Sequence, residues 1–193
     1  KSWVLPSSES EYQEGINSLS RYQARLSDPS QKSALFYARA DNLNNWLGDV
    51  GTRLGSLSQR LSASVGRVKL NTALKTEVVA PGQVPQVDEE IVETPWMQID
   101  NVFYEARGQA WALSHLLRAI EVDFADVLAK KNATVSVRQI IRELEASQEP
   151  VWSPMILNGS GFGVLANHSL VMANYISRAN AAVIDLRQLL NQG

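Results

Sequence analysis

Apolar residues recur along much of the chain in steps of four and three, the spacing that puts them on one face of an α-helix. The longest such series lies between Thr94 and Lys131 and consists of Ile99, Phe103, Ala106, Ala110, Leu113, Leu117, Ile120, Phe124 and Val127. Thr94 is placed to act as N-cap, with Pro95 as the first helical residue. The pattern predicts one helix over residues 94–131, roughly 55 Å long, that packs on its neighbours at a shallow angle.

This helix carries a second apolar set beside the first, made of Val102, Tyr104, Trp111, Leu116 and Val122. Its middle is therefore apolar over most of the circumference, which is typical of a helix surrounded by others. Trp111 stands between two alanines, and we expect its ring to be buried between two helices. Charged residues interrupt the series too often for a membrane span.

Two further helices are predicted before it. The first starts at a Ser8–Glu11 capping box, ends at Asp28-Pro29-Ser30, and has its inner face at Tyr12, Ile16, Leu19 and Leu26. The second starts near Ser30 and has its inner face at Phe36, Ala40, Leu43, Leu47, Val50, Leu54, Leu57, Leu61, Ser64 and Val68. It contains Gly48, Gly51 and Gly55, each of which costs about 1 kcal/mol in a helix. Close approach of a neighbour, with Trp111 of the central helix in the groove, is the expected compensation; a bend is the alternative.

Residues 71–93 show no sustained period and hold several prolines, so we predict a long surface loop. A short helix follows over residues 136–147, with Val137, Ile140, Ile141 and Leu144 directed inward. The last helix spans about residues 164–190 and carries Met172, Tyr175, Ala179, Ala182, Leu186 and Leu189 at the same spacing.

The expected fold is all-α: an antiparallel bundle of four main long helices plus one short helix, in a single domain over residues 1–193. Short connections make consecutive helices antiparallel neighbours. The first helix is expected to fold back over the start of the second. The second helix and the central helix are expected to pair along most of their length, and the short helix to cap one end.

The net charge and the absence of cysteine exclude several classes of function. The 193 residues have a net charge of −2 and no basic stripe, so nucleic acid is not an expected partner. Cysteine is absent, which excludes disulfides, thiol catalysis and cysteine-bound metals, and fits either cytoplasm or periplasm.

Three long stretches resemble a bacterial family of unknown function, domain-of-unknown-function family 2333. They are ADNLNNWLGDVGTRLGSLSQRLSASVG, PWMQIDNVFYEARGQAWALSHLLRAIEVDFADVLAKKNATVSVRQIIRELEASQEPVWSP and ILNGSGFGVLANHSLVMANYISRANAAVIDLR. The resemblance implies a Gram-negative bacterial protein. It also implies a hydrophobic segment ahead of this region, which would anchor the domain at the inner membrane, facing the periplasm. It carries over no catalytic residue.

The sequence predicts no metal and no cofactor. A carboxylate-bridged metal site in a helical bundle needs Glu-x-x-His on two helices. The two histidines are His115 and His168, and the residue three positions before each is Ala112 and Leu165.

Polar residues of the central helix are the first candidate site. Arg118 and Glu121 are placed to pair with each other, as are Asp126 and Lys130. Glu105, Arg107 and His115 form either part of a set of solvated or interhelical ion pairs, which is the favoured interpretation, or the lining of a small-molecule pocket with His115 as general base. No nucleophile or second carboxylate stands at a recognisable spacing, so no catalytic residue is assigned.

A glycine-rich turn is the second candidate. Gly159, Ser160, Gly161 and Gly163 precede the last helix, with His168 close behind. Such a turn can present backbone N–H groups to an anion, although neither nucleotide-binding motif is met, and a tight structural turn is the favoured interpretation. The asparagines of the last helix are expected to bond to Asn42, Asn44 and Asn45 of the second, with a partner-binding face as the alternative.

Two functions follow as hypotheses. The first is a non-enzymatic interaction or scaffold domain of the bacterial envelope with a protein partner, its oligomeric state left open. The second is a ligand-binding or enzymatic domain that uses a cleft near His115 or the glycine turn. The first predicts exposed apolar surface, and the second an apolar concavity with convergent polar groups.

Overall fold

The computed structural model describes residues 8–30, 34–70, 89–160 and 162–192. The chain forms two compact units, residues 1–38 and residues 39–193, which are described separately. The first contains helix α1 (Ser8–Leu26). The second contains, in order, α2 (Ala40–Ser62), η1 (Ala63–Val65), β1 (Arg67–Leu70), β2 (Glu89–Val92), η2 (Trp96–Gln98), α3 (Ile99–Asp123), α4 (Ala125–Lys130), α5 (Thr134–Ala146) and α6 (His168–Asn191).

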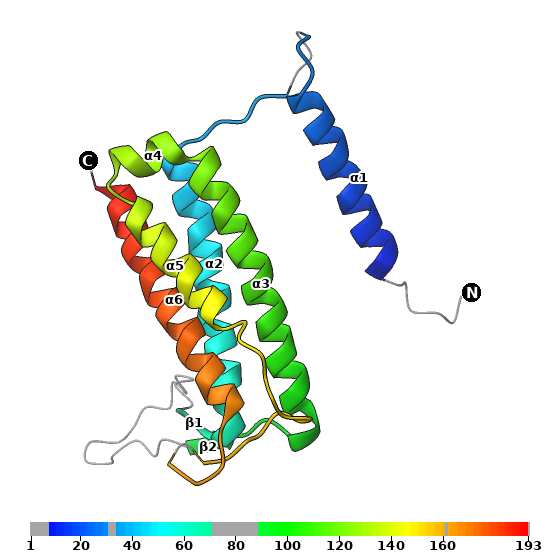
Figure 1. Ribbon diagram of the computed structural model, residues 1–193, viewed down its shortest axis with the longest axis vertical. Helices are drawn as coiled ribbons and strands as arrows, with labels where there is room; N and C mark the ends of the chain where they lie inside the picture. The colour runs from blue at the N-terminus through cyan, green and yellow to red at the C-terminus, as the bar shows by residue number, and fades with distance from the viewer. Residues whose placement is uncertain (1–7, 31–33, 71–88, 161, 193) are drawn as a thin grey trace, which may run out of the picture. The chain divides into compact units, whose positions relative to one another are not determined.

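Helices α2, α3, α5 and α6 form a bundle, and the all-α prediction is confirmed (Figure 1). Helix α6 packs along α2 on one side and α5 on the other, and α5 packs on α3. The core is filled by the predicted inward positions, with Leu47, Leu57, Leu117, Ile140, Ile176 and Leu186 among the side chains almost wholly removed from solvent.

The short helix is a full member of the bundle, so its predicted place as an end cap is wrong. Val137, Ile140, Ile141 and Leu144 of α5 are buried as expected, but they face both α3 and α6. Helix α5 has only 13 residues. It can still pack within the bundle because the short helix α4 reverses the chain at the end of α3.

Helix α1 forms where the sequence predicts it. Within its own unit, Tyr12, Ile16 and Leu19 are 73%, 55% and 70% exposed, since α1 is the only helix described there. That α1 folds back over the start of α2 stays a prediction. The spacing of apolar residues gives a helix an apolar face, but that face is buried only where a neighbouring element covers it.

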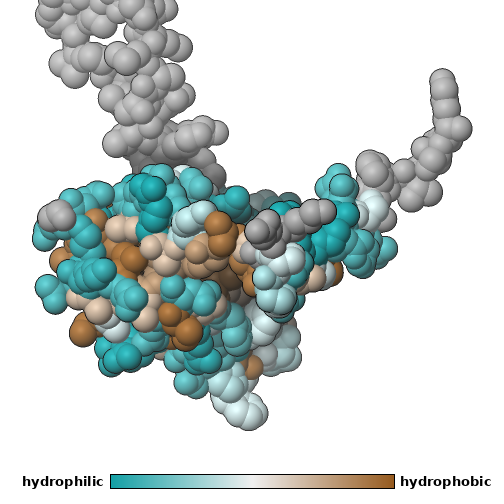
Figure 2. Space-filling view, turned by 90° about the horizontal axis from the view of Figure 1, so that it is seen from above, coloured by the Kyte–Doolittle hydropathy of each residue, from teal (hydrophilic) through white to brown (hydrophobic). Residues whose placement is uncertain are grey.

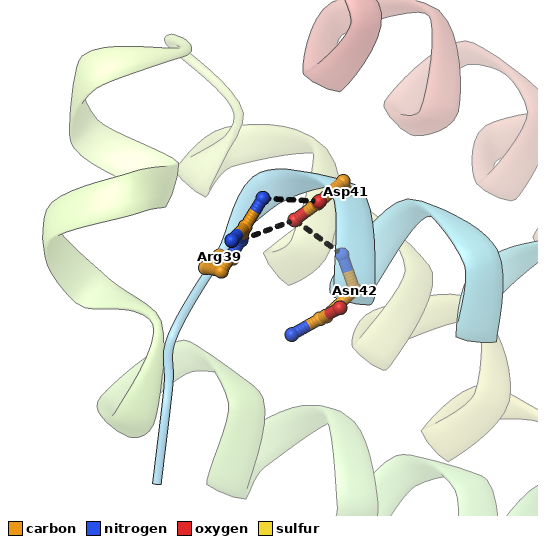
Figure 3. Close-up of polar contacts among 3 residues, drawn as sticks. All are labelled: Arg39, Asp41 and Asn42. Atoms are coloured by element: carbon orange, nitrogen blue, oxygen red, sulfur yellow. Dashed lines mark hydrogen bonds and ion pairs between the residues drawn. The ribbon is translucent and has the colours of Figure 1, made fainter.

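Helix α2 begins ten residues later than predicted, because a local polar cluster sets its start (Figure 3). The guanidinium of Arg39 donates to both carboxylate oxygens of Asp41, at 3.0 and 2.7 Å, and the backbone N–H of Asn42 donates to Asp41 at 2.9 Å. The bond from Arg39 lowers the pKa of Asp41 below its ordinary value. Phe36, predicted as part of the helical face, lies before the helix and is exposed.

The glycines of α2 do meet a close neighbour, but that neighbour is α6. A methyl group placed on Gly51 would lie 3.4 Å from Oδ1 of Asn180 and 3.7 Å from Cγ1 of Val183. One on Gly48 would lie 3.2 Å from Nη2 of Arg187. The predicted pairing of α2 with the central helix along most of their length is wrong, since α2 lies mainly along α6.

The predicted central helix is divided into η2, α3 and α4. The backbone leaves the α conformation at Phe124, with φ −108° and ψ 18°, and α4 then starts. At the other end Thr94 is not the N-cap: Pro95 precedes η2, and α3 follows Gln98. The backbone N–H of Thr94 instead donates to the carbonyl of Ala63 at 2.9 Å, which holds the arriving chain against the end of α2.

A small antiparallel pair of strands lies between α2 and η2. Its register pairs Arg67 with Val92 and Leu70 with Glu89. The sequence placed Val68 at the end of a helix and residues 89–92 in a loop, so both assignments are wrong. Residues 71–88, the rest of the predicted loop, lie outside the described residues.

The last helix begins at His168, four residues later than predicted. Asn167 is its N-cap, and the side-chain oxygen accepts from the backbone N–H of Leu170 at 2.8 Å. An Asn at this position satisfies one of the free N–H groups of the first turn.

Candidate functional site

A cleft of about 220 Å³ opens where α3, the connection from α5 to α6, and the first turns of α6 meet. In Figure 1 these are the lower half of α3, the chain that leaves α5, and the orange start of α6. Most of the lining is apolar or aromatic, and the residues include Phe103, Val151, Trp152, Val171, Met172 and Tyr175, with Arg107, Glu149 and His168.

Arg107 joins two walls of the cleft. Its guanidinium donates to the carbonyl oxygens of Gln148 at 2.5 Å and Glu149 at 2.8 Å, just beyond the end of α5. The side chain of Gln148 donates back to the carbonyl of Arg107 at 3.2 Å. A cation suits a helix C-terminus, where carbonyl groups lack partners. Arg107 therefore fixes the connection after α5 against α3.

His168 is held by backbone bonds to the same connection. Its Nδ1 accepts from the N–H of Leu157 at 3.1 Å, and its own backbone N–H donates to the carbonyl of Leu157 at 3.0 Å. A neutral imidazole that accepts at Nδ1 carries its proton on Nε2. Among the described residues no hydrogen bond links His168 to a hydroxyl or a carboxylate.

A shallow depression adjoins the cleft on the outer side of α3, lined by Tyr104, Arg107, Gly108, Trp111 and Gln148. Arg107 belongs to both concavities. The Trp111 side chain is 58% exposed, and its ring meets that of His115 edge-on, with centroids 4.4 Å apart. The predicted burial of Trp111 is wrong, because the glycines of α2 are occupied by α6.

Of the predicted residues of the central helix, Arg107 lines both concavities, and Glu105, His115, Arg118 and Glu121 line neither. Arg118 pairs with Glu145 of α5, and Glu121 pairs with Arg138 of α5 at 2.5 Å, so the predicted bond between Arg118 and Glu121 is absent. His115 is exposed beside Trp111. The favoured interpretation, interhelical ion pairs, describes these contacts.

Glu105, the other carboxylate proposed to line a cleft, pairs instead with Arg60 of α2 at 2.5 Å. The hydrogen bond from Arg60 lowers the pKa of Glu105 below its ordinary value. Of the three residues proposed as a cleft lining, only Arg107 lines one.

Two backbone N–H groups of the glycine turn donate to carbonyl groups of the same connection. The N–H of Gly159 donates to the carbonyl of Ala166 at 3.0 Å, and that of Gly163 donates to Ser160 at 2.9 Å. A methyl group on Gly159 would lie 2.1 Å from the carbonyl oxygen of Leu165, so no other residue fits there. Helix α6 starts five residues after Gly163, which separates the turn from the helix N-terminus. These contacts are those of a tight structural turn; Gly161 lies outside the described residues.

The expected asparagine bonding between α2 and α6 forms at Asn44, with Asn191 as its partner on α6. Asn44 donates to Asn191 at 2.9 Å and accepts from Arg187 at 3.1 Å. Asn180 lies against the glycines of α2 instead.

Sequence reasoning missed Trp152 and Tyr175. Tyr175 has the spacing of a core residue and lies at the edge of the core, where it lines the cleft. Trp152 stands between Pro150 and Pro154. This position could have indicated a surface site, because prolines on both sides keep the residue out of a helix and place it in a surface connection.

The profile of one bacterial protein family matches the chain over its whole length, residues 1–193. The chain belongs to the DUF2333 family. The family is described as an uncharacterized protein conserved in bacteria. No curated protein and no solved structure matches this DUF2333 chain.

Two features are absent from the described part of the DUF2333 chain. No group of three or more His, Asp or Glu residues there is placed to hold a metal ion. None of the helices within it has the length and apolar character needed to cross a membrane.

Large apolar side chains of the DUF2333 bundle are also exposed away from the cleft. Figure 2 looks onto the end of the molecule where α4 lies, and brown and tan apolar atoms stand there among teal polar ones. Val122 and Val135, from the elements next to α4, are among the exposed apolar residues. Scattered apolar exposure of this kind is ordinary. The cleft differs because its exposed aromatic side chains surround adjoining concavities.

Proposed function

We propose that this DUF2333 domain is a non-enzymatic protein-interaction domain, and that the cleft and the adjoining depression receive an apolar segment of a protein partner. One observation carries the proposal. Trp152 is 94% exposed, and with Trp111 and Tyr104 it edges two concavities joined at Arg107. Trp, Tyr and Arg are the residue types in which binding energy concentrates at protein interfaces.

The size of the cleft favours a side chain over a larger ligand. Pockets for small molecules usually measure about 300–1,000 Å³, whereas a cavity of about 150 Å³ already holds a benzene ring. The cleft, at about 220 Å³, has room for one large apolar side chain as an anchor.

The polar groups of the cleft also favour binding over chemistry. Arg107 is engaged by two backbone carbonyls and His168 by a backbone N–H. The hydroxyl of Ser147 donates to the carbonyl of Leu144 at 2.5 Å. The Arg107 guanidinium, the Ser147 hydroxyl and Nδ1 of His168 thus contribute to the structure of the wall, which favours a binding surface over a catalytic one.

The proposed place of action is the periplasmic side of the bacterial inner membrane. The support is the resemblance of the sequence to a family whose members carry a hydrophobic segment ahead of this region. A reporter enzyme that is active only in the periplasm, fused after Gly193 in the full-length protein, should be active. A reporter active only in the cytoplasm, fused at the same point, should not be. The reverse pattern would contradict the location.

The interaction is tested by site-specific photo-crosslinking in a bacterium that makes the protein. A photoreactive amino acid at either of two rim positions, Tyr104 of the depression or Val171 of the cleft, should give a discrete adduct with a protein. The same amino acid at Arg53, exposed on α2, is the matched control. Trp111→Ala together with Trp152→Ala should remove the adduct while lowering the melting temperature by only about 2–4 °C, because both side chains are exposed.

An adduct of equal yield at Arg53, or no adduct at either rim position, would contradict the proposal. Adduct formation that survives both tryptophan substitutions would show that the partner binds elsewhere on the bundle.

A further inference from the structure

One end of the bundle exposes large apolar side chains from two separate connections. The turn before α6 exposes Phe162, Val164 and Leu165, and η2 exposes Trp96 and Met97. We call these five side chains the apolar end. None of them lines the cleft or the depression. The hydrogen bonds of the glycine turn account for its backbone path but not for the exposure of these side chains.

Two hydrogen bonds hold both connections at the end of α2. The backbone N–H of Thr94, just ahead of η2, donates to the carbonyl of Ala63 at 2.9 Å. The side-chain amide of Asn158, at the base of the turn, donates to the carbonyl of Ser64 at 2.6 Å. Figure 1 shows the start of α3 and the turn before α6 at the end of the bundle where β1 and β2 lie. The apolar side chains of both connections are therefore presented at the same end.

Both connections lack charged residues. No Asp, Glu, Lys or Arg occurs in residues 150–177 or in residues 94–99, although these types make up 20% of the chain. The charges that flank η2 along the chain are acidic, Glu93 and Asp100, and both are exposed. A surface without charge is suited to hydrocarbon, in which a charged side chain is costly.

We propose that the apolar end binds a lipid bilayer, with Phe162, Val164 and Leu165 immersed where the headgroups meet the acyl chains. Exposed apolar patches mark either protein or membrane contacts. Phe162 and Val164 are 107% and 105% exposed, so they protrude from the surface. A fluid bilayer accepts a protruding side chain without a complementary shape, whereas a protein interface buries one in a matching pocket. Trp96 also suits the bilayer, because Trp rings are enriched at the level of the headgroups.

The backbone of the turn is suited to shallow immersion. Polar backbone groups that enter a bilayer need partners within the protein, because hydrocarbon offers none. The N–H of Gly159 donates to the carbonyl of Ala166 at 3.0 Å, and that of Gly163 donates to the carbonyl of Ser160 at 2.9 Å. The expected depth is that of interfacial segments, about 5–10 Å into the boundary between headgroups and acyl chains.

A fluorescent label tests the contact directly, because the chain has no cysteine of its own. A polarity-sensitive fluorophore on Leu165→Cys should brighten and shift to the blue on phosphatidylcholine vesicles, and a nitroxide on the acyl chains should quench it. Val122→Cys is the matched control, since Val122 is 74% exposed against 66% for Leu165 and lies near the other end of α3. No response at position 165, or an equal response at position 122, overturns the proposal.

Co-sedimentation of the unlabelled chain with the same vesicles measures what the side chains contribute. Phe162→Ser together with Val164→Ser should weaken binding at least about tenfold, because two large apolar side chains no longer enter the bilayer. Val122→Ser together with Val135→Ser removes two exposed apolar side chains elsewhere on the bundle and should bind like the unchanged chain. Equal binding by all three proteins contradicts immersion of the turn.

The charge of the lipid distinguishes immersion from electrostatic attraction. Because acidic residues flank η2, phosphatidylglycerol in the vesicles should not strengthen binding, and added salt should not weaken it. Binding that requires the anionic lipid and is lost in salt would overturn the proposal. So would a photoreactive amino acid at Phe162 that captures a protein while the label at position 165 ignores vesicles, since the apolar end would then belong to a protein partner.

Discussion

Helices α1 and α2 have the same spacing of apolar residues in sequence, but their apolar faces differ in burial. Leu43, Leu47, Leu57 and Leu61 of α2 are at most 2% exposed, while the corresponding face of α1 has no other described helix in its own unit to cover it. The difference lies in the neighbours: α2 has α6 along its length, and side chains of α6 pack on three glycines of α2. Spacing produces an apolar face, and only a complementary surface buries it.

The comparison is tested most strongly by truncating one leucine in each helix. Leu57→Ala in α2 should lower the free energy of unfolding by about 2–5 kcal/mol, because the site is closed and a cavity remains. Leu19→Ala in α1 should change unfolding of the bundle by less than about 0.5 kcal/mol. Urea melts followed by tryptophan fluorescence measure both, and similar losses would show that the α1 face is covered in solution.

The glycines of the two helices provide a second test. Gly51→Leu should cost about 1–3 kcal/mol, because the new side chain meets Asn180 and Val183. Gly15→Leu in α1 should not lower the stability of the bundle, since nothing lies within 4 Å of a methyl group there. If Gly51→Leu is also tolerated, the close contact between α2 and α6 is looser than described.

Trp111 extends the comparison to α3, which is buried on one side and open on the other. Trp111→Ala should lower stability by only about 0.5–1 kcal/mol, through loss of its ring contact with His115. The burial expected from sequence would instead give about 3–5 kcal/mol. A urea melt distinguishes the two values, and the larger loss of stability would show that Trp111 is buried in the core.

The smallest effect concerns the ion pair between Arg60 of α2 and Glu105 of α3. The bond from Arg60 lowers the pKa of Glu105 below its ordinary value of 4.5, so the pair stabilises the folded state above that pH. The contribution is lost as pH falls further, through the folded-state pKa.

Both side chains are more than 40% exposed, so Arg60→Gln should cost at most about 0.5 kcal/mol at pH 7. The difference from the unchanged protein should disappear in urea melts well below pH 4. Arg25→Gln in α1 is the control and should leave bundle stability unchanged at every pH. A penalty for Arg60→Gln that grows in acid would contradict the assignment.

The inward faces of α2, α3, α5 and α6 were predictable from sequence, because a helix face depends only on spacing of three and four residues. Leu47, Leu117, Ile140 and Leu186 are buried where that spacing places them. Helix starts were less predictable. The beginning of α2 depends on the bonds among Arg39, Asp41 and Asn42, and no period signals them.

Very little of the candidate site could be predicted from the sequence. The cleft exists because Arg107 meets the carbonyls of Gln148 and Glu149, more than forty residues away, and His168 meets Leu157. Of the described residues that the sequence proposed for a site, Arg107 and His168 line the cleft. His115, Arg118 and Glu121 share a helix with Arg107 but face α5 or solvent.

By itself, then, the sequence determined which segments are helical, which side of each is apolar, and that the fold is all-α. Only the tertiary structure decided which helices are neighbours. The glycines of α2 offer a groove to any helix that can fill it, and Asn180 and Val183 of α6 do so instead of Trp111. Spacing is a property of one helix, whereas the choice of neighbour depends on the fit of two surfaces far apart in the chain.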